Sequence, residues 1–122
     1  MRLQFHRVAI LLSGDIEKEA EDRIVRSGHT LKAEVLKVPH HGSSSSSTLP
    51  FLEKVNPTYA MISVGARAMG RLPHPEVLRR FQDLGCRVYR TDHQGAMTVV
   101  TDGEKIKIIP TIADHGTGQK ES

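Results

Sequence analysis

The chain has 122 residues, of which 38% are hydrophobic and 25% are charged, and its formal net charge is +3. This length and composition predict one soluble globular domain with a single core, and no apolar run approaches the roughly 20 residues of a membrane-spanning helix. The single cysteine, Cys86, excludes a disulfide framework and a cysteine-rich zinc site. Aromatic residues make up only 4%, which argues against a stacking platform for single-stranded nucleic acid.

Strands and helices alternate in the first part of the chain. Residues 7–12, RVAILL, predict a buried strand that runs into Ser13-Gly14-Asp15. Residues 16–27 carry apolar side chains at helical spacing, with acids early and an arginine late, and Gly28 stops the pattern, which predicts an amphipathic helix. Residues 33–38 predict a second strand, closed by Pro39.

The second part continues this alternation and ends in β-structure. Residues 49–55 predict a short helix, residues 59–65 a buried strand and residues 75–85 a helix that starts with Pro75. Three β-rich pieces begin at residues 86, 96 and 105, and Asp102-Gly103 predicts a hairpin between the last two. We expect an α/β fold over residues 1–110, a mixed sheet with helices on one face followed by a β-meander, and a flexible polar tail over residues 111–122.

Polar residues follow three consecutive predicted strands. Asp15 follows the first strand, His40 and His41 follow the second, and a loop ending at His74 follows the third. Because ligands gather at the carboxyl ends of strands in such sheets, we expect these residues to meet at one edge. A carboxylate can bridge two cations, and a neutral imidazole is a good ligand for zinc or manganese, but an open catalytic zinc site needs three ligands.

Each of these residues also has a plainer interpretation. Asp15 suits the N-cap of the following helix, and a loop imidazole is as often hydrogen-bonded to backbone as bound to a metal. The serines from Ser43 to Ser47 are typical of a flexible linker or of a helix entry. His74, which lies between two prolines, suits a turn. Residue chemistry alone leaves these alternatives open.

Three stretches resemble one known family when they are taken together. They are LLSGDIEKEAEDRIVRSG, LKAEVLKVPHHGSSSSSTLPFLEKVNPTYAMISVG and PHPEVLRRFQDLGCRVYRTDHQGAMTVVTDGEKIKI. In order and without large gaps, from residue 7 to about residue 109, they resemble the C-terminal part of the metallo-β-lactamase domain of ComEC proteins, the DNA-uptake proteins of competent bacteria. The resemblance implies the C-terminal half of an αββα sandwich, a partial domain over residues 1–110.

The resemblance assigns metal ligands. Asp15 matches a metal-bridging aspartate of the family, and the pair that follows the second strand supplies its last metal-binding histidine. We favour His40 as the ligand and His41 as a neighbouring polar group or substrate contact. The complete domain is implied to bind two divalent ions, manganese or zinc.

The resemblance also assigns substrate contacts and a catalytic acid. The serines that match the family's substrate-site pattern are Ser43, Ser46 and Ser47, which are implied to line the site or to donate hydrogen bonds to a phosphate. His74 matches the second histidine of an HPHP element and is implied to be a general acid for the leaving oxygen, so His74 and His41 are the catalytic candidates. Leu72 stands where the family has the first histidine of that element.

The implied function is that of a two-metal phosphodiesterase, a nuclease that acts on a DNA strand during natural transformation. The family's HxDxDH motif, which supplies most of its metal ligands, does not occur in this sequence. The implied partners are therefore single-stranded DNA, the missing N-terminal half of the domain and the membrane channel of a parent protein in the bacterial cytoplasmic membrane, with this domain on the outer face. Two alternatives stay open: an inactive half-domain that binds its missing half or a second copy of itself, and a metallo-hydrolase of another ester.

Overall fold

The structure is a computed structural model that describes residues 1–14, 16–64 and 72–111, without the side chains of His40 and Gln94. Its elements are β1 (Arg2–Phe5), β2 (Val8–Leu12), α1 (Lys18–Arg26), β3 (Val35–Lys37), the 3₁₀ helix η1 (Pro39–Gly42), α2 (Leu49–Val55), β4 (Tyr59–Ile62), α3 (Pro75–Asp83), β5 (Arg87–Arg90), α4 (Thr91–Gln94), β6 (Met97–Thr101) and β7 (Ile106–Pro110). Within these ranges, no helix has the length and apolar character needed to span a membrane. The predicted tail falls almost wholly on residues 112–122, outside the described residues.

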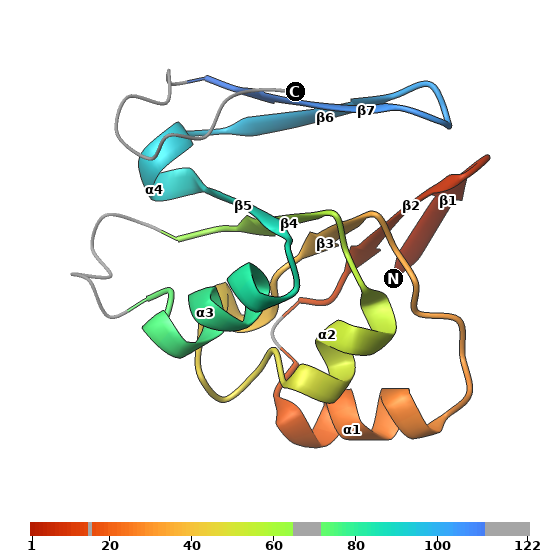
Figure 1. Ribbon diagram of the computed structural model, residues 1–122, viewed down its shortest axis with the longest axis vertical. Coiled ribbons are helices and arrows are strands. Elements are labelled where there is room, and N and C mark those ends of the chain that lie inside the picture. The colour runs from red at the N-terminus through yellow and green to blue at the C-terminus, as the bar shows by residue number, and fades with distance from the viewer. Residues whose placement is uncertain (15, 65–71, 112–122) are drawn as a thin grey trace.

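The central layer is a five-stranded sheet in the order β1-β2-β3-β4-β5. β1 is antiparallel to β2, whereas β2, β3, β4 and β5 are parallel to one another. The helices α1, α2 and α3 cover one face of this sheet, and the hairpin of β6 and β7 lies over the other face (Figure 1). The predicted mixed sheet with helices on one face is therefore confirmed.

The predicted β-meander is wrong for its first strand. β5 pairs with β4 in parallel, and only β6 and β7 form an antiparallel hairpin. The reason is the intervening helix α3, because a crossover through a helix returns the chain parallel to the strand that it left.

The main core lies between the sheet and its helices. Alternate residues of β2, β3 and β4, namely Leu11, Leu36 and Ile62, pack with Phe51 of α2 and Phe81 of α3. Such alternation follows from the pleat of a strand, which sends successive side chains to opposite faces. The core therefore holds the strands in place, and with them the loops that leave the strand ends and carry the predicted site.

The second face of the sheet is only partly covered. Val8 and Val35 are buried there, as is Ile108 of the hairpin. The hairpin tip contacts the turn between β1 and β2, where the Arg7 amide donates to the Gly103 carbonyl at 2.8 Å. Leu3, which pairs with Ile10 on this face, stays 51% exposed, so the apolar surface extends beyond the hairpin to β1.

Two boundaries differ from the expectations. The sequence predicts a strand over residues 7–12 and no separate β1 before it, because His6 makes the turn between β1 and β2 with a φ of 53°, without the glycine or asparagine that marks most such turns. The N-cap of α1 is Glu17, with no side-chain capping bond, so the alternative interpretation of Asp15 as this N-cap is wrong.

Candidate functional site

The loops after β2, β3 and β4 begin side by side at the carboxyl edge of the sheet. The parallel register places Leu12 opposite Lys37, and Lys37 opposite Met61. Beyond the last pair of β2 and β3, the Ser13 hydroxyl donates to the Lys37 carbonyl at 2.6 Å. The sequence-based expectation that three loops gather at one edge is confirmed for the described strand ends.

The chain on the far side of Asp15 is bonded to residues 43–48, which we call the serine loop. The Ser46 hydroxyl donates to the Ile16 carbonyl at 2.5 Å, and the Lys18 amide donates to the Ser45 carbonyl at 2.9 Å. The Ser45 hydroxyl also donates to the Glu17 carboxylate at 3.2 Å. Asp15 itself lies outside the described residues, but the chain directly after it is held against the serine loop.

The histidine pair lies in η1, directly after β3. The side chain of His40 is outside the described part of the chain, whereas His41 is exposed and its Nδ1 lies 2.6 Å from the Ser63 carbonyl oxygen. Since a carbonyl only accepts, this hydrogen bond places the ring hydrogen on Nδ1 and leaves the Nε2 lone pair available. Metal-binding histidines are commonly oriented in this way. The structure therefore gives His41 a ligand-like geometry that the sequence did not favour.

Gly42 brings His74 next to the histidine turn. The His74 amide donates to the Gly42 carbonyl at 2.9 Å. A Cβ on Gly42 would lie 2.5 Å from Pro73 Cβ, and its φ is +81°, so only glycine fits this close approach. His74 is the N-cap of α3, where its Nδ1 accepts from the Glu76 amide at 3.1 Å. The plainer interpretation of His74 as a turn residue is thus refined to a helix cap, and its Nε2–H has no acceptor within the described ranges.

The predicted substrate serines differ in their accessibility. Ser43 is half-buried, with its hydroxyl 2.9 Å from that of Ser45. Ser46 and Ser47 are both 0% exposed. Within the described ranges the Ser47 hydroxyl has no hydrogen-bond partner. A phosphate can therefore reach Ser43 as the loop stands, and the predicted contacts of the other two serines would need the loop to move.

Two charged residues that the sequence analysis missed hold the serine loop in place. Glu21 of α1 is 0% exposed, and its carboxylate accepts the Ser47 amide at 2.6 Å and the Thr48 amide at 2.8 Å. Arg80 of α3 donates to the Ser47 carbonyl at 2.8 Å.

The serine loop leads into α2 at its N-cap Thr48, so the helix-entry interpretation is confirmed and that of a flexible linker is wrong. Glu21 lies three residues before Ile24 on an apolar helix face, and an acidic residue at such a position was the sequence signal that could have identified its buried role.

The end of β5 joins the same edge. The Val64 amide donates to the Thr91 hydroxyl oxygen at 2.7 Å, and that hydroxyl donates to the Val64 carbonyl at 2.8 Å. Arg90 donates twice to the Asp92 carboxylate, at 3.0 and 2.7 Å. Burial raises the pKa of Asp92, but the hydrogen bonds and positive charge of Arg90 outweigh this, so the pKa is lowered overall. The fourth parallel strand thus adds a fixed ion pair beside the site.

Metal-binding groups are partly outside the described residues. Among the side chains that the structure describes, no three of the His, Cys, Asp and Glu type come together, and that set excludes Asp15 and His40. Burial raises the pKa of the Cys86 thiol to about 12, so this residue stays protonated at neutral pH and is not a thiolate ligand. The predicted carboxylate and imidazole donors suit manganese or zinc, and the Nε2 of His41, which is without a hydrogen-bond partner in the described part of the chain, fits such an ion.

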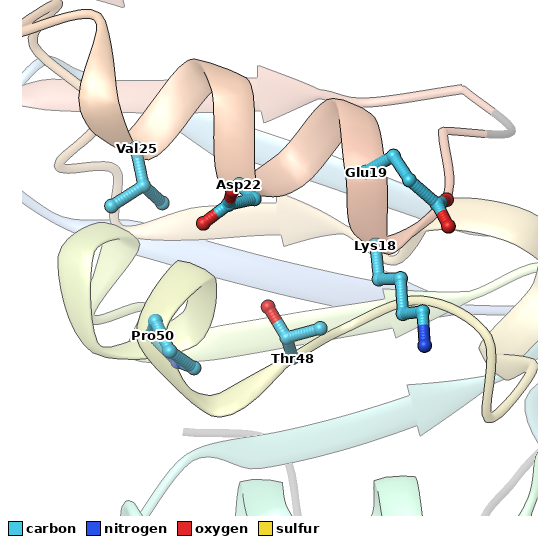
Figure 2. Close-up of a pocket in the computed structure, with 6 residues that line it drawn as sticks. All are labelled: Lys18, Glu19, Asp22, Val25, Thr48 and Pro50. Atoms are coloured by element: carbon cyan, nitrogen blue, oxygen red, sulfur yellow. The ribbon is translucent and has the colours of Figure 1, made fainter.

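A groove between α1 and α2 borders the end of the serine loop (Figure 2). It is lined by Lys18, Glu19, Asp22, Val25, Thr48 and Pro50. Among the predicted site residues whose side chains the structure describes, none lines this groove. The groove is therefore separate from the candidate site at the carboxyl edge.

Parallel strands joined by helices, with their loops gathered at one carboxyl edge, define the chain as an α/β protein. No protein-family model matches it. It is 42% identical over 92 residues to the uncharacterized protein YcaI of Escherichia coli K12, 40% over 87 residues to ComE operon protein 3 of Bacillus subtilis 168, and 37% over 90 residues to competence protein ComA of Neisseria gonorrhoeae.

These matches cover most of the chain but little of each relative. They include 75%, 71% and 73% of this chain and 12%, 11% and 13% of the respective relatives. The chain is thus a homologue of a short segment of bacterial proteins that include a competence protein. This confirms the competence part of the resemblance, while the metallo-β-lactamase assignment stays a prediction.

Proposed function

We propose that the chain is part of a metal-dependent phosphodiesterase domain that acts on DNA during natural transformation. One observation carries the proposal: His41, His74 and the chain flanking Asp15 are bonded to one another's loops at the carboxyl edge of the sheet. Homology to competence protein ComA supports DNA as the substrate class. The fold we propose is the C-terminal half of an αββα metallo-β-lactamase sandwich, supported by the order of layers from helices through sheet to hairpin (Figure 1).

The residues that would hold divalent ions are Asp15 and the histidine pair. His41 competes with His40 for the ligand role because its Nδ1 is bonded to the Ser63 carbonyl and its Nε2 has no hydrogen-bond partner among the described residues. Divalent ions, when bound, supply the activation of water and the neutralisation of charge on a phosphate. We propose that the missing N-terminal half of the domain supplies the remaining ligands, and that the parent protein carries this domain on the outer face of the bacterial cytoplasmic membrane.

His74 and Ser43 contribute hydrogen bonds in this proposal. The Nδ1 of His74 accepts from the Glu76 amide, so the neutral ring presents Nε2–H to a phosphate or leaving oxygen. For His74 to act as a general acid, its ring must take up a second proton and release the Glu76 amide. The half-buried Ser43 hydroxyl, which donates to the Ser45 oxygen because Ser45 donates to Glu17, must turn away from that oxygen to donate to a non-bridging phosphate oxygen.

A second candidate function is that of an inactive half-domain that serves assembly. The observation in its favour is the apolar surface of β1, where Leu3 is 51% and Phe5 is 53% exposed. A monomeric soluble protein rarely leaves such side chains together without a partner. In this case the chain binds metal weakly and cleaves nothing alone.

Metal binding and DNA cleavage by the purified chain test both candidates. We expect calorimetry to detect Mn²⁺ or Zn²⁺ binding that Asp15→Ala abolishes and that His40→Ala or His41→Ala weakens. His29→Ala is the matched control, because His29 is exposed and its hydrogen bonds within the described part of the chain go to Ser27 near the end of α1. Metal-dependent cleavage of single-stranded DNA supports the phosphodiesterase, and metal binding without cleavage supports the half-domain. Binding that is identical in all four variants overturns the proposed site.

A further inference from the structure

The outer edge of β1 presents unpaired backbone groups. Met1 and Leu12 exchange both of their backbone hydrogen bonds, at 2.9 and 2.8 Å. Since such pairs alternate along an antiparallel ladder, Leu3 and Phe5 also face β2, and the N–H and C=O groups of Arg2 and Gln4 point away from it.

The contacts of β2 support this direction. Ala9, which lies opposite Gln4, bonds to Glu34 on the β3 side through both its amide and its carbonyl. No backbone group of Arg2 or Gln4 has a hydrogen-bond partner within the ranges that the structure describes. An edge of this kind is a template for pairing with another strand.

The side chains of β1 alternate in a palindromic pattern. Met1, Leu3 and Phe5 are apolar and lie on one face, where they are 77%, 51% and 53% exposed. Arg2 and Gln4 lie on the other face, and the Arg2 guanidinium donates to the Gln4 amide oxygen at 2.8 Å. Read in either direction, the strand is apolar, polar, apolar, polar, apolar, which suits antiparallel pairing of the strand with itself.

We propose that two copies of the chain associate through β1, antiparallel and with the two-fold axis at Leu3. Arg2 then forms a hydrogen-bonded pair with Gln4 of the second copy on each side of the axis, which satisfies the free backbone groups. Leu3 lies beside Leu3 of the second copy, and Met1 lies beside its Phe5, so the exposed apolar side chains meet. The two sheets become one continuous sheet.

The other antiparallel registers of β1 with its copy are less favourable than the register centred on Leu3. An axis at Arg2 places two arginines directly opposite each other, and like charges in that position are destabilising. An axis at Gln4 places Arg2 opposite His6, where a φ of 53° turns the chain out of the strand. All three axes pair apolar with apolar side chains, but only the axis at Leu3 places the Arg2 side chain opposite an amide acceptor, that of Gln4, so the polar side chains select the register.

Sedimentation of the full chain over a concentration series from about 1 µM to about 1 mM tests the association. We expect a reversible dimer whose Kd rises at least about tenfold in Leu3→Lys, because two ammonium groups meet at the axis. Gln4→Pro removes the outward N–H without disturbing the β1–β2 ladder and has the same effect. Val100→Lys, which adds the same charge at an aliphatic residue 48% exposed on the hairpin, is the matched control and leaves the dimer intact.

Cysteine cross-linking tests the register. Residues that face each other at a non-hydrogen-bonded antiparallel position have Cα atoms about 4.5 Å apart, within disulfide range. Leu3→Cys therefore cross-links to itself under mild oxidation, and Gln4→Cys does not because its opposite residue is Arg2. Cys86 is buried and does not compete. A monomer throughout the series, a dimer indifferent to Leu3→Lys, or equal cross-linking of both cysteine variants overturns the proposal.

Discussion

The carboxyl edge of the central sheet and its lateral edge at β1 differ in how many of their polar groups have hydrogen-bond partners among the described residues. At the carboxyl edge, the loops after four parallel strands are joined by side-chain and backbone hydrogen bonds, and a buried carboxylate holds the serine loop. At the β1 edge, backbone groups point outward and Leu3 and Phe5 are exposed. The comparison indicates that hydrogen bonds hold the loops at the carboxyl edge in a fixed arrangement, whereas the β1 edge offers backbone groups and apolar side chains to a partner.

Loss of the Glu21 carboxylate should have the largest effect on the first region. Glu21→Ala leaves the Ser47 and Thr48 amides without their acceptor, and hydrogen bonds to a charged group contribute about 1.5 to 3 kcal/mol each, so we expect a loss of about 3 to 6 kcal/mol in the free energy of unfolding. Urea denaturation measures this loss.

Two further variants separate the carboxylate from the helix that carries it. Glu21→Gln keeps one acceptor oxygen and should lose about half as much, which keeps the measurement possible if the alanine variant does not fold. Glu19→Ala, at an exposed position of the same helix, should change stability by less than about 0.5 kcal/mol. Equal losses in Glu21→Ala and Glu19→Ala would show that the buried carboxylate does not hold the loop.

Substitution at Gly42 should break the contact between the histidine turn and His74. In Gly42→Ala the new Cβ would lie 2.5 Å from Pro73 Cβ at a φ of +81°, so we expect a loss of about 3 kcal/mol. Gly28→Ala has a φ of +79° and nothing within 4 Å, so it isolates the backbone cost, about 1 kcal/mol. If denaturation curves show equal losses of unfolding free energy in the two variants, the structure relaxes around the new Cβ and Pro73 without strain.

The smallest expected effect concerns the pH dependence of the Arg90–Asp92 pair. Burial raises the pKa of Asp92 and Arg90 lowers it by more, so the folded pKa lies below its ordinary value of about 3.9. The stability from this pair is therefore present above that ordinary value and is lost as the pH falls through the lowered pKa. Melting temperatures of Asp92→Asn should fall less steeply than those of the unmodified chain below about pH 4.

The control for this pH effect is an exposed ion pair. Asp22→Asn removes the partner of Arg26, where both side chains are more than half exposed, and such pairs contribute little. We expect this variant to follow the unmodified chain across the same pH range. If Asp92→Asn does so too, the Arg90–Asp92 contact contributes nothing to folding.

Most elements were predictable because their signals are local. The strand over residues 8–12 and the helix over residues 75–83 follow from periodicity, proline and glycine positions in the sequence itself. The gathering of loops at one edge followed from alternating strands and helices, because parallel strands point the same way. Sequence reasoning could therefore place His41 and His74 near each other although 33 residues separate their numbers.

The features that were missed depend on partners far along the chain. Nothing near Glu21 shows that its carboxylate meets amides 26 and 27 residues later. The pairing of β5 with β4 depends on how α3 packs, and the His6 turn lacks a common turn residue. The orientation of the His41 ring, with Nδ1 bonded and Nε2 turned away from that bond, could be found only by knowing where the Ser63 carbonyl lies. The metal itself and its ligand set stay predictions.

The bonding of the serine loop has a thermodynamic consequence for recognition. A mobile loop loses conformational entropy when a ligand fixes it, and that loss subtracts from affinity. Here Glu21 and Arg80 have already removed much of this freedom before any ligand arrives. A phosphate bound at Ser43, as we propose, would meet a loop that is already ordered, so less of its binding free energy would be offset by ordering that loop.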